Sequence, residues 1–121
     1  MFNQINSLGG WGEFASLGML EDGYEDWTSA LYQGTHHQFV ASAMTKKIAH
    51  EIDPGMQIGM MLGDDATYYA TSNPKDIFAN TQYMQRTVYF YSDVLVHGEY
   101  PGYMLRYFKD NDIHVKMCQE E

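Results

Sequence analysis

The pattern of apolar and polar positions predicts a long helix from about residue 22 to residue 52. Asp22 stands at its start with Glu25 three positions later, a spacing typical of a capping box. The stretch "DPG" ends the helix, because proline cannot continue it. Positions three and four residues apart define one face that we expect to be buried: Trp27, Leu31, Gly34, His37, Ala41, Met44, Ile48 and Ile52.

The stretch "MQIGMML" at 56–62 differs from this pattern, because it is almost wholly apolar and lies between Gly55 and Gly63. Such a run predicts a strand that is buried on both faces. The segment "GDDATYYATS" follows as its exit loop.

A second long helix is predicted after this loop. Asn73 is a suitable cap and Pro74 suits the first helical position, whereas Gly98 ends the helix. A further short helix is expected from Pro101 to about Lys109. The inner face of the second long helix is predicted to carry Ile77, Met84, Val88, Tyr91 and Leu95.

The opening of the chain predicts little regular structure. "MFN" resembles the end of a strand, and residues 6–26 carry five glycines in "NSLGGWGEFASLGMLEDGYED", which predicts a long loop. The order strand, helix, strand, helix is typical of an α/β fold with a parallel sheet. One or two strands do not complete a sheet, so the sequence indicates a slice of a larger α/β protein.

Composition limits the partners and the location. Sixteen acidic and seven basic side chains give a net charge of −9, which makes nucleic acid an unsuitable partner. Cys118 is the only cysteine, so no internal disulfide can form and a reducing, cytoplasmic location is expected. No signal peptide or membrane-spanning run is evident, and no cofactor is indicated.

Four stretches together resemble the family 1 glycoside hydrolases, in particular their 6-phospho-β-glucosidase branch. They are "FNQIN", "HHQFVASA", "QIGMML" and "GEYPGYM", in order and with compatible spacing. The resemblance implies part of a (β/α)8 TIM barrel, from the end of the fourth strand through the fifth helix. Residues 1–121 would then be a single partial domain with two long helices and one or two parallel strands, lacking the N-terminal and C-terminal parts of the barrel.

The resemblance also assigns the candidate catalytic position. Gln4 stands where the family has a Glu that serves as general acid and base, and Asn3 would bind the 2-hydroxyl of the sugar. Retaining glycosidases need two carboxyl groups about 5 Å apart, and an amide cannot cycle a proton. The family's nucleophile, a Glu on the seventh strand, and the residues that would hold a 6-phosphate are expected beyond this chain.

Other candidates lie in loops. Tyr68 is a candidate for binding substrate, and Tyr69, Trp11 and Phe14 are further aromatic residues that could border a sugar cleft. The two histidines and the two loop aspartates do not predict a metal site, because adjacent helical residues point about 100° apart and a third ligand is lacking. The two histidines are His36 and His37, and the two aspartates are Asp64 and Asp65. His37 is instead expected to be a core histidine.

Two functions follow as hypotheses. The first is a fragment of a retaining hydrolase that acts on phosphorylated β-glucosides in the full-length enzyme and is inactive alone. The second is a non-catalytic interaction module that self-associates through its exposed strand.

Overall fold

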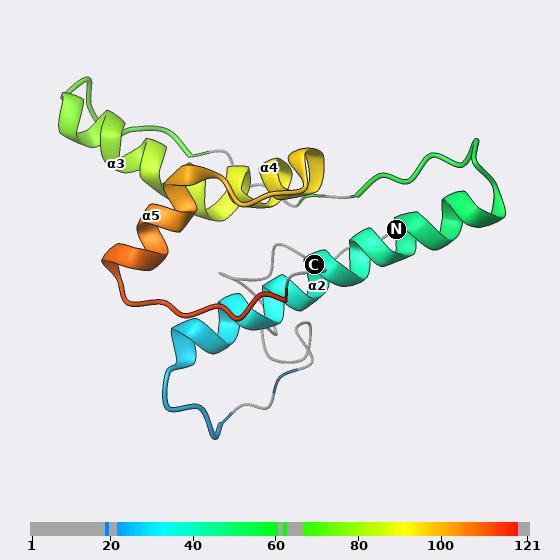
Figure 1. Cartoon of the computed structure of the whole chain (residues 1–121). Helices are drawn as coiled ribbons and strands as arrows, with labels where there is room; N and C mark the ends of the chain where they lie inside the picture. The colour runs from blue at the N-terminus through cyan, green and yellow to red at the C-terminus, as the bar shows by residue number, and fades with distance from the viewer. Residues whose placement is uncertain (1–18, 20–21, 61, 63–66, 119–121) are drawn as a thin grey trace.

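The computed structural model describes residues 19, 22–60, 62 and 67–118, and their regular structure is helical (Figure 1). Helix α3, the π-helical turn η1 and helix α4 follow one another without a break, so they form the single long helix predicted after residue 73. The elements are α2 (Trp27–Ile52), α3 (Pro74–Met84), η1 (Gln85–Tyr89), α4 (Phe90–His97) and α5 (Gly102–Asp110).

The ends of the two long helices are set by local side chains. The Asn73 side chain accepts a hydrogen bond from the backbone N–H of Lys75, Pro74 takes the first helical position, and Gly98 closes α4 with φ of 75°. These predictions are confirmed. The predicted cap at Asp22 is wrong, because Asp26 caps α2 and accepts from the backbone N–H of Ser29 at 3.0 Å. The hydrogen bonds from Ser29 lower the pKa of Asp26.

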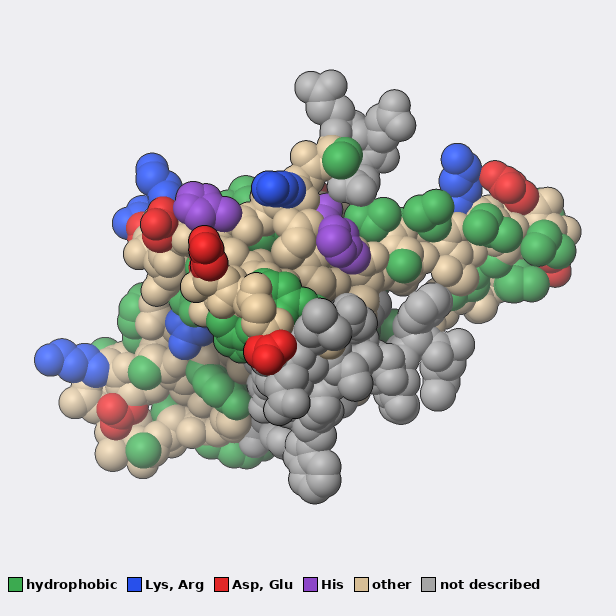
Figure 2. Space-filling view, turned by 90° about the horizontal axis from the view of Figure 1, so that it is seen from below, with side chains coloured by type: hydrophobic (Ala, Val, Ile, Leu, Met, Phe, Trp, Pro, Cys, Tyr) green, Lys and Arg blue, Asp and Glu red, His purple; other side chains and the backbone are tan. Residues whose placement is uncertain are grey.

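The buried face of α2 shares only Gly34 with the predicted one. Within the described structure, the residues that α2 buries all lie in its N-terminal half: Ser29, Tyr32, Gly34, Thr35, His36 and Phe39. Its C-terminal half forms an arm with hydrophobic side chains on its surface (Figure 2), where Met44, Ile48 and Ile52 are 59%, 53% and 76% exposed. The prediction assumed a partner along the whole helix, whereas the described partners contact its first half.

The core is a cluster of aromatic rings between α2, α4 and α5. Phe90 has no exposed surface and lies at its centre. Its ring centroid is 5.4 Å from that of Phe39 and 5.3 Å from that of Tyr100, in edge-to-face geometry. Tyr32 and Phe108 form another such pair at 4.8 Å. Each pair stabilises the fold by about 0.5–1.5 kcal/mol beyond the burial of apolar area. These contacts therefore hold together helices that are distant in sequence.

One histidine belongs to this core, but it is His36 and not His37. His36 is buried, and its Nδ1 lies 3.1 Å from the hydroxyl of Tyr100. Burial raises the pKa of Tyr100, so this hydroxyl stays protonated. His37 is exposed and pairs with the side-chain amide of Gln33, one turn earlier, at 3.0 Å.

The π-helical turn explains why the predicted inner face of the second long helix is only partly correct. Tyr91 is buried and Leu95 packs against the core, but Ile77 is 39% exposed and α3 has no buried residue. A π-turn adds one residue to a helical turn, so the face before η1 is rotated relative to the face after it.

The strand predicted at 56–62 is not confirmed. Residues 56–60 and 62 form no strand, nor does any other residue that the structure describes. Met56 and Ile58 are 41% and 37% exposed, so the faces expected to be buried are open. A strand needs a neighbouring backbone for its hydrogen bonds, and the described residues offer none here. The stub "MFN" lies outside the described residues.

An extended C-terminal segment after α5 lies along α2 (Figure 1). The side-chain amide of Gln33 donates to the carbonyl of Lys116 at 3.1 Å and accepts from its N–H at 2.7 Å. The N–H of His114 donates to the hydroxyl of Ser29 at 2.8 Å, and Ile113 is buried in the core. Polar side chains of α2 therefore satisfy backbone groups that would otherwise need a strand partner.

The position of Phe90 gives a test of this core. We expect Phe90→Ala to lower the free energy of unfolding by about 3–5 kcal/mol, because it removes a ring with no exposed surface. Urea unfolding followed by circular dichroism measures the loss. Val96→Ala on the same helix α4 is the matched control, since Val96 is 76% exposed and its truncation should change stability by less than about 0.5 kcal/mol. Equal losses in the two variants would contradict the proposed core.

Candidate functional site

The candidate catalytic residues fall outside the described part of the chain. This holds for Gln4 and Asn3, and equally for Trp11 and Phe14. Their roles therefore stay predictions.

Tyr68 and Tyr69 are the described residues of the predicted sugar-binding loop, and they are 85% and 50% exposed. The loop beside them is attached to α3. The hydroxyl of Thr67 donates to the sulfur of Met84 at 3.1 Å, and the Asn80 amide donates to the carbonyl of Thr67 at 3.3 Å. The residue that precedes the two tyrosines is thus attached to α3, and both phenol rings remain open to a ligand. An exposed ring can stack on a sugar, which keeps Tyr68 a candidate for substrate binding.

No metal site can be assigned among the side chains that the structure describes. The ring centroids of His36 and His37 are 6.2 Å apart, and the planes of the two rings are inclined at 49° to each other. Over residues 22–60 and 67–118, no group of three His, Cys, Asp or Glu residues is placed to hold an ion. Asp64 and Asp65 lie outside the described residues.

A surface pocket of about 460 Å³ lies between α3, η1 and α5. Sequence reasoning missed it, because it is formed by helices that meet only in the folded chain. The lining consists of two arginines (Arg86 and Arg106), three amides (Gln82, Gln85 and Asn111), three aromatic rings (Phe78, Tyr103 and Tyr107) and Asp110. The one sequence signal of this pocket was the spacing of four residues between Arg106 and Asp110, which makes their opposite charges neighbours on a helix.

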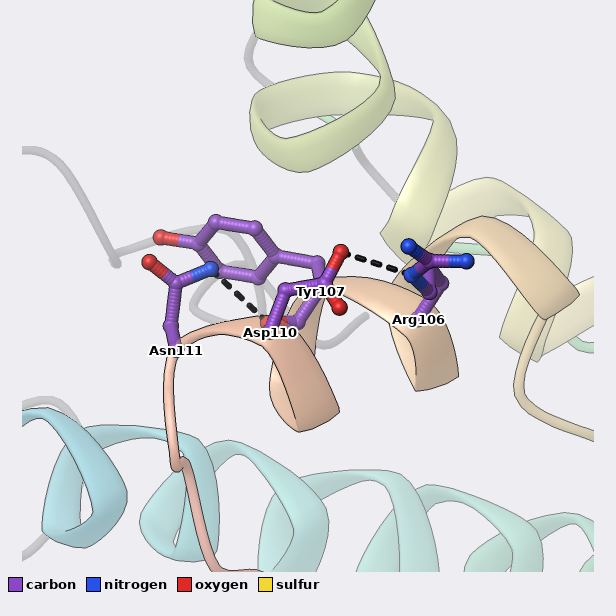
Figure 3. Close-up of polar contacts among 4 residues, drawn as sticks. All are labelled: Arg106, Tyr107, Asp110 and Asn111. Carbon is purple, nitrogen blue, oxygen red and sulfur yellow. Dashed lines mark hydrogen bonds and ion pairs between the residues drawn. The ribbon is translucent and has the colours of Figure 1, made fainter.

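Two polar contacts lie in the lining of this pocket (Figure 3). Arg106 Nε donates to Asp110 Oδ2 at 2.7 Å, and the Asn111 amide donates to the carbonyl of Tyr107 at 2.9 Å. The guanidinium carbon of Arg86 lies 5.2 Å from the ring centroid of Tyr107, a cation–π contact.

Two tyrosines of this region stay protonated to unusually high pH. Burial, and then the hydrogen bond that its hydroxyl donates to Asp93 at 2.7 Å, raise the pKa of Tyr103. Tyr32 lies next to Tyr107, with ring centroids 6.3 Å apart, and burial raises its pKa to about 12. Both phenols therefore act as neutral hydrogen-bond donors over the physiological range.

None of the helices described is both long enough and apolar enough to cross a lipid bilayer.

The motifs quoted from the sequence lie within a match to a known protein family. The sequence pattern of glycosyl hydrolase family 1 matches residues 2–121, and the chain belongs to this family. Membership implies a TIM barrel, so the expected fold class is supported at that level.

The chain is similar to several characterised members of the family. It is 42% identical over 118 residues to the aryl-phospho-β-D-glucosidase BglH of Bacillus subtilis, covering 98% of this chain and 25% of the relative. It is 38% identical over 120 residues to a 6-phospho-β-glucosidase of Clostridium longisporum, covering 99% and 25%. The 6-phospho-β-glucosidase AscB of Escherichia coli is 35% identical over 114 residues, covering 94% and 24%. The chain thus spans about a quarter of the length of these relatives, and the resemblance inferred from the motifs is confirmed.

The raised pKa of Tyr32 makes stability depend on pH in the alkaline range. The unfolded phenol ionises near its ordinary value of 10.0, whereas the folded phenol ionises at about 12. As the pH rises, the unfolded state therefore loses its proton first, so the stabilisation is complete below pH 10 and is lost towards pH 12. We expect Tyr32→Phe to lose less of its free energy of unfolding across this window than the wild type.

Urea titrations at a series of pH values measure this difference. At pH 7 both side chains are neutral, so that measurement isolates the effect of removing the hydroxyl itself. An identical pH dependence of the two proteins above pH 10 would show that Tyr32 is not buried as described.

Proposed function

We propose that this chain forms part of the barrel of a retaining glycoside hydrolase that acts on 6-phospho-β-glucosides. The observation that carries the proposal is the match to glycosyl hydrolase family 1 over residues 2–121. The relatives that the chain matches over 94–99% of its length are named as phospho-β-glucosidases. The substrate is thus a phosphorylated β-glucoside, bound by a barrel of which these residues supply one part.

The proposed role of the N-terminal motif follows from the chemistry of retaining glycosidases. One carboxyl group protonates the leaving oxygen and then activates water, and the second attacks the sugar to form a covalent intermediate. Gln4 occupies the position of the first group, and Asn3 that of the residue that binds the 2-hydroxyl. Gln4 can donate a hydrogen bond to the glycosidic oxygen, but it cannot supply a proton to it.

The second carboxyl group is the reason that we propose no hydrolysis by the 121-residue polypeptide alone. By the family resemblance, the nucleophile lies on the seventh strand, outside these residues. The described glutamates, Glu25, Glu51 and Glu99, do not replace it, since all three are exposed at or next to helix ends. Without a nucleophile, the covalent intermediate cannot form.

Self-association is a second candidate property, and the exposed arm of α2 favours it. Ile48 and Ile52 present apolar side chains along this arm, at 53% and 76% exposure. Exposed apolar surface favours association, because association removes it from water. We propose that copies of the isolated polypeptide associate through this surface.

The catalytic proposal predicts the outcome of one substitution. Neither the wild-type polypeptide nor its Gln4→Glu variant is expected to hydrolyse a nitrophenyl β-glucoside 6-phosphate. Restoring the acid would recover a factor of about 10²–10⁴ in rate, but only where a nucleophile is present. The measurement is release of nitrophenol, with the Bacillus subtilis relative BglH as the positive control.

The corresponding substitutions in BglH test the assignment of Gln4 itself. We expect the carboxylate that aligns with Gln4 to be essential there, so that its replacement by Gln abolishes most of the activity. Full activity of that BglH variant would contradict the assignment. Turnover by the Gln4→Glu polypeptide would contradict the need for a nucleophile outside it.

The association proposal predicts that one charge on the arm reduces dye binding. Ile52→Lys should lower the fluorescence of a hydrophobic dye and shift the protein towards the monomer in analytical ultracentrifugation. Val96→Lys is the matched control, because Ile52 and Val96 are both 76% exposed but Val96 lies on α4. Equal effects of the two substitutions would show that the arm is not the associating surface.

A further inference from the structure

The pocket between α3, η1 and α5 contains an arginine whose donors are unused. The guanidinium of Arg86 is partly buried and lies over the ring of Tyr107, 5.2 Å from its centroid. Within the part of the chain that the structure describes, it donates no hydrogen bond and makes no ion pair. The ring therefore fixes the position of a charged group that has five N–H donors and no protein acceptor.

A second guanidinium lines the same pocket. Arg106 uses its Nε to bind Asp110 at 2.7 Å (Figure 3), which leaves its two terminal amino groups for another acceptor. Two arginines and one aspartate give the pocket a local charge of +1, in a chain whose net charge is −9. Both arginines line the pocket, and the side chain of Arg106 is 75% exposed, so a ligand can reach its terminal amino groups. An anion bound there would offset the positive charge of the two groups.

The backbone at the pocket is also unusual. Gln85 and Arg86 are the first two residues of η1, and π-helical turns of this kind frequently occur at functional sites. The pocket volume of about 460 Å³ lies within the range of small-molecule sites. Phe78 and Tyr103 add ring faces to the lining, so there is an apolar wall beside the two charges.

From these observations we propose that the pocket binds a phosphate group, either free or carried by a small ring-containing molecule. Arg86 and Arg106 would hold the phosphate oxygens, because planar guanidinium groups match that geometry in bidentate fashion. The amides of Gln85 and Asn111 would contact the remainder of the ligand. Asp110 weakens anion binding, because it competes for Arg106 and repels the phosphate.

The lining of this pocket does not include the proposed catalytic residue Gln4, and ligand binding there does not depend on hydrolysis. The pocket is built from helices, whereas a barrel enzyme places its catalytic groups at the C-terminal ends of strands. Binding at this pocket and turnover of a phosphoglucoside can therefore succeed or fail independently.

Titration of the wild-type polypeptide with inorganic phosphate tests the proposal directly. We expect the side-chain Nε–Hε resonances of Arg86 and Arg106 to shift in a saturable manner in nitrogen-correlated NMR spectra. Phenyl phosphate should bind at least as tightly as inorganic phosphate, whereas phenol should not bind in the same range. Absence of saturable shifts, or equal binding of phenol and phenyl phosphate, would overturn the proposal.

Three substitutions separate a built site from general electrostatics. Arg86→Gln should weaken phosphate binding about ten-fold or more, because charge-assisted hydrogen bonds are lost. Asp110→Asn should strengthen it several-fold. Lys109→Gln removes one positive charge from α5 without touching the pocket lining, and it should change the affinity by less than about two-fold. Equal weakening by Arg86→Gln and Lys109→Gln, in variants with wild-type circular dichroism, would show that net charge alone is responsible and overturn the site.

Discussion

The edge-to-face packing around Phe90 is the constraint on which the described structure depends. Helices α2, α4 and α5 are joined through this one ring, which contacts rings from all three elements or their connections. Aromatic pairs prefer defined angles and distances, so the cluster fixes helix orientation more strictly than aliphatic packing of the same area would. Two further features of the structure lie at the margin of this cluster. The pocket with Arg86 is walled by Tyr107, the neighbour of Phe108 in the core, and the Gln33 contact to the C-terminal segment follows from where Tyr32 is held.

Local signals in the sequence were sufficient for most helix ends, but not for the start of α2, and they were insufficient for the helix faces. Asn73 with Pro74, Gly98 and the "DPG" stretch act through their own backbone geometry, so they predict a boundary without knowledge of the rest of the fold. A buried face depends on what covers it. The apolar stripe from Trp27 to Ile52 was a reasonable prediction for a helix covered along its whole length, but the described core covers only the first half. His36 rather than His37 is buried because His36 lies on the face of α2 that contacts Tyr100.

For the candidate site too, local sequence signals were informative, whereas contacts formed only in the folded chain could not be predicted. Gln4 and Asn3 were identified through motif resemblance, and the family match supports that resemblance without describing the geometry of these residues. The Arg86 pocket could not be predicted, because a π-helical turn has no recognised sequence signature and because Arg86 and Tyr107 are 21 positions apart. The sequence could not predict either whether residues 56–62 form a strand. Their apolar composition indicates burial, but a strand also needs the backbone of another segment as its hydrogen-bonding partner.

Helix α2 combines a packed half with an unsupported half, and this has a consequence for its local stability. A helix held at one end opens from the other, and in the exposed turns only intrinsic propensity and intrahelical hydrogen bonds oppose fraying. Several residues of the segment 45–52 are β-branched or charged. The exposed side chains of Met44, Ile48 and Ile52 contribute little hydrophobic stabilisation, because they remain in water. Backbone amides in these turns should exchange with solvent far faster than those beside Phe39. Any surface that covers Met44 and Ile48 would make this fraying helix end rigid. The order of the helix end is therefore a direct measure of what the arm contacts.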